Sequence, residues 1–313
     1  MKPDVLVVWP NRPRHMALLE SRYALHHLYR EEDPERLLAE VGPRVRALVT
    51  TGEKGASAGL IGRLPSLEIV ACFGVGIDAI DQEACGRRNI PITNTPDVLT
   101  EDVADMGLAL MLAVMRRIPF GDRWVREGRW RSEGTMPLTT SPRGRTLGIL
   151  GLGRIGRALA RRGEALGMKI AYHGRRRQAD VAWPFYPDLV EMARRADVLA
   201  LCCPGGEATR GIVTAEVIEA LGPEGFLVNV ARGSVVDEPA LVKALGEGRI
   251  AGAGLDVFAD EPNVPETLLG MENVVLQPHA ASATVSTRDA MAQLVVDNLE
   301  AHFAGRPLLT PFR

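Results

Sequence analysis

Three polar stretches in the C-terminal half carry the side chains best suited to catalysis. Each comes just past a short apolar run that is typical of a buried strand, and the reactive members are Arg232, Glu261 and His279. The stretches are residues 229–233, 256–262 and 277–282. A guanidinium can hold a carboxylate through two parallel hydrogen bonds. An imidazole beside a carboxylate can donate and accept a proton near neutral pH. This set predicts chemistry on an anionic carbonyl compound.

A glycine-rich turn precedes these stretches. An apolar strand is predicted over residues 146–150 and a helix over 155–166, and between them stand Gly151, Gly153 and Gly156 in the spacing G-x-G-x-x-G. The first glycine allows the tight turn, the second lets the backbone approach a pyrophosphate, and the third lets helix and strand pack closely. The pattern predicts a dinucleotide site, and a dinucleotide beside an acid–base set favours hydride transfer.

The helix that follows the turn would hold the phosphates at its N-terminus. Backbone N–H groups there, at Arg154 and Ile155, point toward the bound anion. A second strand is predicted over residues 169–173, where NAD-selective sites usually end in an acidic residue. Here the chain has no acid.

A basic cluster stands in place of that acid. The residues after the second strand are Gly174, Arg175, Arg176 and Arg177. Guanidinium groups attract a 2′-phosphate that a carboxylate would repel, and each charge-assisted hydrogen bond contributes about 1.5–3 kcal/mol. The sequence therefore predicts that NADPH is preferred over NADH, although a solvated basic turn would look the same.

The alternation of strands and helices predicts an α/β protein with two domains, Rossmann-like or flavodoxin-like, each built on a parallel sheet. Apolar runs at 4–9, 45–50, 67–73 and 90–94 predict strands before the glycine turn, and residues 14–29 have helical spacing. We expect a substrate domain at 1–97 and 284–313, interrupted by a dinucleotide-binding domain at 98–283. The final helix, near residues 284–303, would return to the first domain.

Bulk composition excludes several classes of protein. The chain has 313 residues, a formal net charge of -2 and 46% hydrophobic residues, so nothing indicates a nucleic-acid or membrane partner. No apolar run approaches the length of a membrane span, and no signal peptide is recognisable. The four cysteines lack the spacing of a zinc site or a disulfide framework, so we expect no metal, reduced thiols and a cytoplasmic protein.

The segment at residues 120–145 has no clear core pattern. It carries Trp124 and Trp130 among charged residues, and exposed aromatic side chains of this kind often form a subunit interface. We expect a homodimer. A local packing arm is the alternative interpretation.

Taken together, these motifs resemble the D-2-hydroxyacid dehydrogenase family in order and spacing over essentially the whole chain. Besides the glycine turn, the matching stretches are Phe73–Asp78, Asn94–Thr100, Val230–Gly233, Gly254–Phe258 with Glu261-Pro262, and Pro278-His279. The branch it most resembles contains the glyoxylate/hydroxypyruvate reductases and hydroxyphenylpyruvate reductases.

The resemblance implies a role for each candidate residue. His279 would be the general acid in reduction of a small 2-oxo acid, Glu261 would orient the imidazole and raise its pKa, and Arg232 would hold the substrate. The backbone N–H groups of Gly74, Val75 and Gly76 would bind the substrate carboxylate. Thr100, Ala231 and Asp256 would lie around the nicotinamide, although Asp256 could equally be a turn residue.

Other activities remain open at this level. Glyoxylate and hydroxypyruvate are the expected substrates, and hydroxyphenylpyruvate, phenylpyruvate and 2-ketogluconate are alternatives. Formate and phosphoglycerate dehydrogenases fit less well, because the chain has Glu261 and lacks the acidic ribose-binding residue. Phosphite oxidation is not excluded by the three catalytic residues. A dinucleotide-sensing corepressor is a distant alternative of another class.

Overall fold

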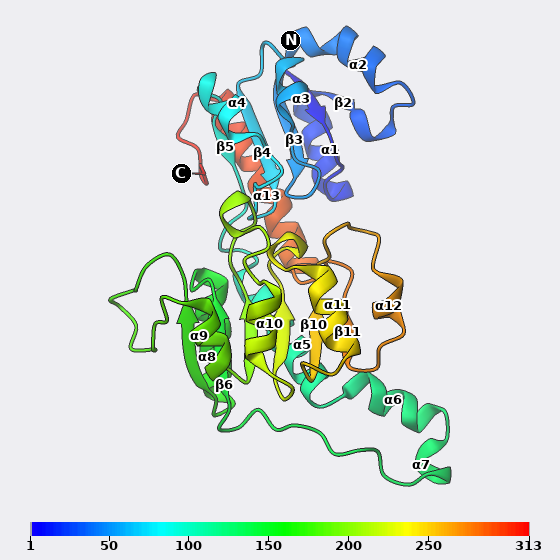
Figure 1. Ribbon diagram of the computed structural model, residues 1–313. Coiled ribbons are helices and arrows are strands. Elements are labelled where there is room, and N and C mark those ends of the chain that lie inside the picture. The colour runs from blue at the N-terminus through cyan, green and yellow to red at the C-terminus, as the bar shows by residue number, and fades with distance from the viewer. Residues whose placement is uncertain (1, 313) are drawn as a thin grey trace. The chain divides into compact units, whose positions relative to one another are not determined.

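The computed structural model describes residues 2–312 and forms two compact units (Figure 1). The first unit comprises Met1–Leu99 and Ser282–Arg313, and the second comprises Thr100–Ala281. The chain therefore leaves the first unit once and returns to it for the final helix. Each unit is an α/β layer structure with its own parallel sheet, which confirms the predicted fold class.

The first unit has a five-stranded sheet in the order β2-β1-β3-β4-β5. All neighbouring strands are parallel. The strands are β1 (Asp4–Val7), β2 (Ala24–His27), β3 (Val45–Thr51), β4 (Ile69–Phe73) and β5 (Ile92–Thr93). The order reverses between β1 and β3, as in flavodoxin-like folds.

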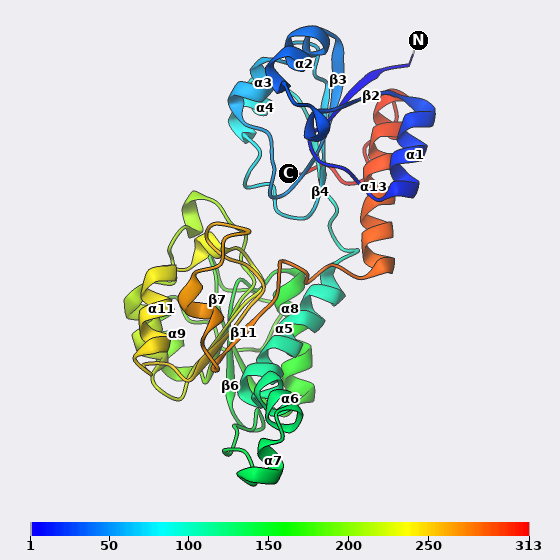
Figure 2. The ribbon, with the colours of Figure 1, turned by 90° about the vertical axis from the view of Figure 1, so that its right-hand side faces the viewer.

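Helices cover both faces of this sheet because alternate strand residues point to opposite sides. Val5 and Val7 face α1 (Pro13–Arg22) and α13 (Val285–Phe303), whereas Leu6 packs with the core beneath the helices of the other face. Those helices are α2 (Pro34–Val41), α3 (Ala58–Gly62) and α4 (Gln82–Arg87). Figure 2 shows α1 beside α13, and Arg12 pairs with Asp289 at 2.9 Å between them.

The helix predicted over residues 14–29 is wrong in its second half. The helix ends at Arg22, Tyr23 is extended with φ −123°, and Ala24–His27 form the edge strand β2. Met16, Leu19 and Tyr23 are buried and have helical spacing, so the apolar pattern alone continued past the true end. The ladder of hydrogen bonds to β1 decides the conformation of the following residues.

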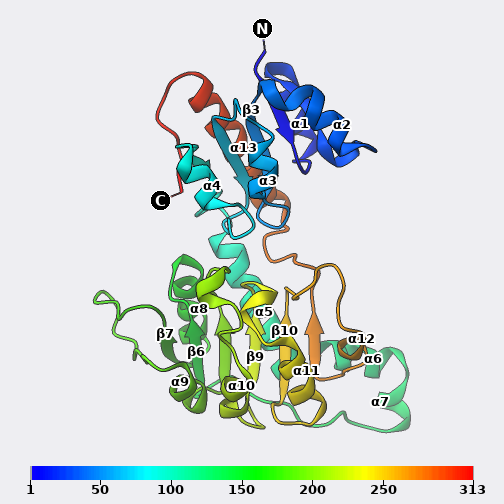
Figure 3. The ribbon, with the colours of Figure 1, turned by 45° about the horizontal axis from the view of Figure 1, so that its top comes forward.

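The second unit has a six-stranded parallel sheet in the order β11-β10-β9-β8-β6-β7 (Figure 3). The strands are β6 (Thr146–Leu150), β7 (Lys169–His173), β8 (Val198–Leu201), β9 (Phe226–Asn229), β10 (Gly252–Leu255) and β11 (Val274–Leu276). From β6 the chain first adds β7 on one side of this strand, and then adds β8 to β11 in turn on its other side. The strand order thus reverses between β6 and β8, where ligands of such sheets bind.

Five helices form the layers on the two faces of this sheet. Helices α5 (Thr100–Met115) and α8 (Arg154–Ala165) pack together on one face. Helices α9 (Leu189–Arg195), α10 (Ala215–Leu221) and α11 (Glu238–Gly246) cover the other face, over the large apolar core of the unit. Gly254 of β10 lies against α5, because a Cβ there would be 2.9 Å from the Leu110 side chain.

The remaining helices are short. They are α6 (Ile118–Arg126), α7 (Arg129–Ser132), α12 (Glu266–Leu269) and 3-10 turns at Leu28–Arg30, Gly42–Arg44, Glu207–Thr209 and Gly233–Val235. The expectation of exposed aromatic residues in segment 120–145 was half right. Trp130 is 62% exposed, but Trp124 is only 7% exposed and packs between Phe120 and Arg129.

The described residues contain no helix with the length and apolar character that a bilayer crossing requires. No disulfide joins the four cysteines, all of which lie within residues 2–312. Burial raises the pKa of the Cys202 thiol to about 12 and that of Cys203 to about 11, so these two thiols are unreactive near neutral pH.

Candidate active site

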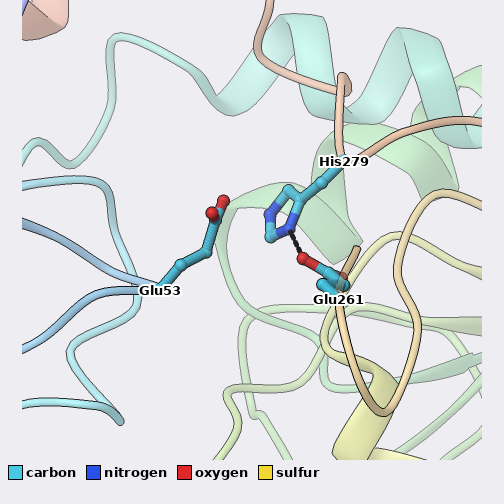
Figure 4. Close-up of side chains that lie close together, drawn as sticks. All are labelled: Glu53, Glu261 and His279. Carbon is cyan, nitrogen blue, oxygen red and sulfur yellow. Dashed lines mark hydrogen bonds and ion pairs between the residues drawn. The ribbon is translucent and has the colours of Figure 1, made fainter. Parts of the chain in front are cut away.

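The central feature of the second unit is a hydrogen bond between His279 and Glu261. Figure 4 shows this bond as a dashed line between the two side chains. His279 Nδ1 lies 2.8 Å from Glu261 Oε2, and both side chains are about one quarter exposed. Glu261 follows β10 and His279 follows β11, which are neighbouring parallel strands. The sheet therefore delivers both side chains to the same edge, as the sequence predicted. The imidazole uses its Nδ1 for this bond.

Glu261 is held as an ionised carboxylate. Burial raises its pKa, but hydrogen bonds from His279 and from the Phe258 N–H, together with the charges of His279 and Arg232, outweigh burial, so that the pKa lies below its usual value. Phe258 donates to Glu261 Oε1 at 3.0 Å, which leaves Oε2 for the imidazole. A carboxylate ionised at neutral pH stabilises the protonated imidazole next to it.

His279 has a strained backbone. Its φ is +50°, in the left-handed region that side chains other than glycine seldom adopt and that costs about 1–2 kcal/mol. Asp256 offsets this cost: its carbonyl accepts from the His279 N–H at 2.8 Å, and its carboxylate accepts from Ala280 at 2.7 Å and Ala281 at 3.0 Å. Asp256 thus fixes the peptide that carries the imidazole.

The carboxyl group of Asp256 is buried, with an exposed fraction of 1%. Burial raises its pKa, and the hydrogen bonds from the Ala280 and Ala281 N–H groups and the charge of His279 only partly oppose this rise. The sequence offered two roles for this residue, contact with the nicotinamide or bracing of a turn. Its bonds to Ala280 and Ala281 are those of a bracing residue.

Arg232 stands on a tightly built loop after β9. Its guanidinium donates to the Ala231 carbonyl at 2.7 Å, and its charge acts on Glu261, so Arg232 belongs to the same cluster as Glu261. A Cβ at Gly233 would lie 1.9 Å from the Phe258 carbonyl carbon, which only glycine tolerates. This contact brings the loops of Arg232 and Glu261 together.

Asn229 is a positioning residue that sequence reasoning did not single out. It is 1% exposed, accepts from the Ala231 N–H at 3.0 Å and donates to the Arg232 carbonyl at 3.0 Å. The sequence did contain a signal for this role: Asn229 stands at the end of an apolar strand, where a buried amide must find hydrogen-bond partners. Its bonds set the conformation of the Arg232 loop.

The glycine turn lies at the point where the strand order reverses. Gly151 has φ +94° and a Cβ there would be 2.6 Å from the Cys203 backbone, while a Cβ at Gly156 would be 2.3 Å from the Gly151 carbonyl oxygen. Gly153 is different, because nothing lies within 4 Å of its Cβ position. Gly153 also occupies the N-cap position of α8, and no side chain there accepts a hydrogen bond from the N–H groups of the first helical turn. The open approach and the uncapped helix end at Arg154 and Ile155 fit a dinucleotide pyrophosphate.

The basic cluster follows β7, as predicted. Arg175, Arg176 and Arg177 are exposed, and within residues 2–312 their guanidinium groups form no hydrogen bond or ion pair with the protein. The arginines of α8 differ, since Arg157 pairs with Asp180 and Arg162 with Asp105. Gly174 precedes the cluster, and nothing lies within 4 Å of its Cβ position. The cluster is therefore available to an anion.

The loop Gly74–Gly76 follows β4 in the first unit. Gly74, with φ +151°, donates its N–H to Thr95 Oγ1 at 3.1 Å, and Asn94 Nδ2 donates to the Val75 carbonyl at 2.8 Å. The N–H groups of Val75 and Gly76 have no acceptor among residues 2–312. Of the three amides predicted to bind a carboxylate, Gly74 is thus already used, and two are available.

Thr100 and Ala231, which the resemblance places around the nicotinamide, both lie in the second unit. Thr100 is the first residue of α5 and is partly buried, and Ala231 is buried beside Arg232. Ala231 has no polar side-chain group, and Thr100 has a hydroxyl that does not ionise near neutral pH. The structure therefore gathers the acid–base residues at strand ends and leaves these two as candidate wall residues.

The chain is similar to proteins of known activity. The family described as "D-isomer specific 2-hydroxyacid dehydrogenase, NAD binding domain" matches residues 108–281. Glyoxylate/hydroxypyruvate reductase A of Arabidopsis thaliana is 51% identical over 293 residues, covering 94% of this chain and 93% of its own. The hydroxyphenylpyruvate reductase of Plectranthus scutellarioides is 50% identical over 293 residues, with the same two shares.

A solved structure is similar over the whole chain. The NADPH-dependent glyoxylate/hydroxypyruvate reductase of Sinorhizobium meliloti, crystallised in complex with NADP and malonate, has a TM-score of 0.94 and 47% identity. The match covers 100% of this chain and 97% of that one.

The second and third glycines of the turn should respond differently to alanine. Gly153→Ala should leave thermal unfolding unchanged and weaken binding of the NAD(P) dinucleotide about tenfold or more, because its methyl group enters the space left for the pyrophosphate. Gly156→Ala should also lower the unfolding free energy by about 1–3 kcal/mol, since its methyl group overlaps the Gly151 carbonyl. Gly62→Ala, in an open position of α3, is the control. Dinucleotide binding as strong in Gly153→Ala as in the wild type would contradict this assignment of the turn.

Proposed function

Because the chain belongs to the D-isomer specific 2-hydroxyacid dehydrogenase family, we propose that it reduces glyoxylate and hydroxypyruvate to the corresponding 2-hydroxy acids with NADPH. The second unit would bind the dinucleotide, and the first would supply the substrate loop. The observation that carries the proposal is the 2.8 Å hydrogen bond between His279 and an ionised Glu261. The positive charge of Arg232 helps to keep the same carboxylate ionised.

Each member of this cluster has a distinct task. Bound NADPH supplies the hydride that is added to the carbonyl carbon. His279 donates its proton from Nε2 to the carbonyl oxygen, and Glu261 holds the other ring nitrogen and stabilises the protonated form. Arg232 binds the substrate's carboxylate and carbonyl oxygens, which fixes the carbon to be attacked. The product leaves with a hydroxyl group where the carbonyl was.

The substrate carboxylate would also be held by the first unit. The amides of Val75 and Gly76 are available on the loop after β4, and two adjacent N–H groups form a small anion-binding nest. The N–H of Gly74 instead fixes the shape of this loop through Thr95. Thr100 and Ala231 would line the nicotinamide site.

Hydroxyphenylpyruvate is the second candidate substrate, because a relative with that activity in its name is 50% identical over 94% of this chain. The two candidate activities are distinguished by assaying a panel of 2-oxo acids with NADPH and with NADH. The proposal requires that kcat/KM for glyoxylate or hydroxypyruvate exceed that for hydroxyphenylpyruvate, phenylpyruvate and 2-ketogluconate.

The cofactor preference rests on the cluster Arg175–Arg177. These side chains have no carboxylate partner among residues 2–312, and no acidic residue stands at the end of β7 to repel a 2′-phosphate. The Sinorhizobium meliloti protein, 47% identical, is described as NADPH-dependent. Both observations support NADPH over NADH.

A homodimer is the proposed assembly. Ile118, Val125 and Trp130 on α6 and α7 are more than half exposed, and Leu138 in the following segment is fully exposed. Burying such apolar side chains against a second copy would stabilise the pair. Sedimentation of the purified chain tests this, and a species of 33.9 kDa at micromolar concentration would contradict it.

We also propose that the protein is cytoplasmic. Its four cysteines form no disulfide, and three of them are buried. Thiols of this kind persist in a reducing compartment.

Replacing the proposed acid should abolish most turnover without loss of cofactor. His279→Ala should lower kcat for glyoxylate reduction by roughly 10²–10⁴ while NADPH binding is retained, because the proton donor is lost and the glycine turn is intact. His302→Ala is a matched control, since His302 also bonds to a glutamate, Glu68, but lies in α13. Turnover near that of the wild type in His279→Ala would refute the role.

Removing one arginine of the cluster should shift the cofactor preference. Arg175→Ala should raise KM for NADPH by roughly 10-fold or more and leave KM for NADH nearly unchanged, because one charge-assisted bond contributes about 1.5–3 kcal/mol. The comparable change Arg87→Ala, at an exposed arginine of α4, should alter neither value. A wild-type enzyme that uses NADH with the higher kcat/KM would overturn the NADPH assignment itself.

A further inference from the structure

Gln178 connects the two loops that would hold the dinucleotide. Its side-chain Nε2 donates to the Leu152 carbonyl at 2.8 Å, within the glycine turn. Its backbone directly follows Arg177, the last residue of the basic cluster. One partly buried amide thus ties the arginine loop to the turn between Gly151 and Gly153.

The same residue closes the arginine loop on itself. The Gln178 N–H donates to the hydroxyl of Tyr172 at 2.8 Å, so five residues, His173 to Arg177, are enclosed between the two partners. Tyr172 is fully buried and packs against Phe185 at a ring distance of 5.3 Å. The loop is therefore anchored to the core at its base.

Arg157 supports Gln178 from helix α8. Its guanidinium donates to Gln178 Oε1 and also forms two bonds with the Asp180 carboxylate, at 2.8 and 2.9 Å. Gln178 consequently has partners for its backbone N–H, its side-chain donor and its side-chain acceptor. Arg175, Arg176 and Arg177 have none for their guanidinium groups within residues 2–312.

We propose that Gln178 is a positioning residue for cofactor selection: it holds the Arg175–Arg177 loop at a fixed place beside the glycine turn, so that the arginines meet a 2′-phosphate without first having to be ordered. Ordering a loop on binding costs conformational entropy, and a loop that is already ordered avoids this cost. Gln178 itself need not touch the cofactor. This inference rests on the proposed NADPH preference.

The test compares both cofactors in Gln178→Ala and Gln178→Met. Each variant loses the donor to Leu152 and the acceptor for Arg157, and the methionine variant keeps the side-chain volume should the alanine variant fold poorly. We expect the ratio of kcat/KM for NADPH to that for NADH to fall about tenfold, through KM for NADPH. We also expect 2′,5′-ADP to bind about tenfold more weakly, with binding of 5′-AMP unchanged. Gln82→Ala, at an exposed residue of α4, is the control.

The outcomes separate the two levels of the proposal. A wild-type enzyme without NADPH preference refutes the proposed cofactor. A wild-type enzyme that prefers NADPH, with an unchanged cofactor ratio in both Gln178 variants, refutes the positioning role. Equal losses for NADPH and NADH, or for 2′,5′-ADP and 5′-AMP, would mean that Gln178 serves only the fold and would also overturn the inference.

Discussion

The site depends on one hydrogen bond, between the imidazole of His279 and the carboxylate of Glu261. At 2.8 Å an ionised carboxylate fixes the ring's orientation and favours its protonated form, which is what a proton donor needs. The rest of the second unit maintains this pair. Phe258 occupies the other carboxylate oxygen, Asp256 holds the left-handed backbone at His279, and Gly233 permits the close approach that adds the charge of Arg232.

The fold explains why residues far apart in sequence meet. Parallel strands end at one edge of a sheet, so the loops after β9, β10 and β11 share that edge. The apolar runs and the polar residues after them were therefore enough to predict the α/β class, the glycine turn and the cluster of Arg232, Glu261 and His279. Periodicity was insufficient where a neighbouring strand decides the conformation, as at Ala24–His27.

The supporting contacts could not be predicted in the same way. The bond from Asn229 to the Arg232 loop, the use of the Gly74 N–H by Thr95 and the bridge from Gln178 to Leu152 each depend on where two loops lie in space. Sequence spacing identifies which residue types follow a strand, but not which amide their side chains reach. Trp124 illustrates the same limit, because its burial comes from Phe120 and Arg129 in the folded segment.

The pH dependence of catalysis tests the central pair most directly. The measurement is kcat/KM for glyoxylate reduction from pH 5 to 10 in the wild type and in Glu261→Gln. The control is Glu266→Gln, a change at the first residue of α12. The neutral amide no longer stabilises the protonated imidazole, so the alkaline limb should move to lower pH by about 1 unit or more, and the maximum should fall. An alkaline limb at the same pH in Glu261→Gln and the wild type would contradict the account.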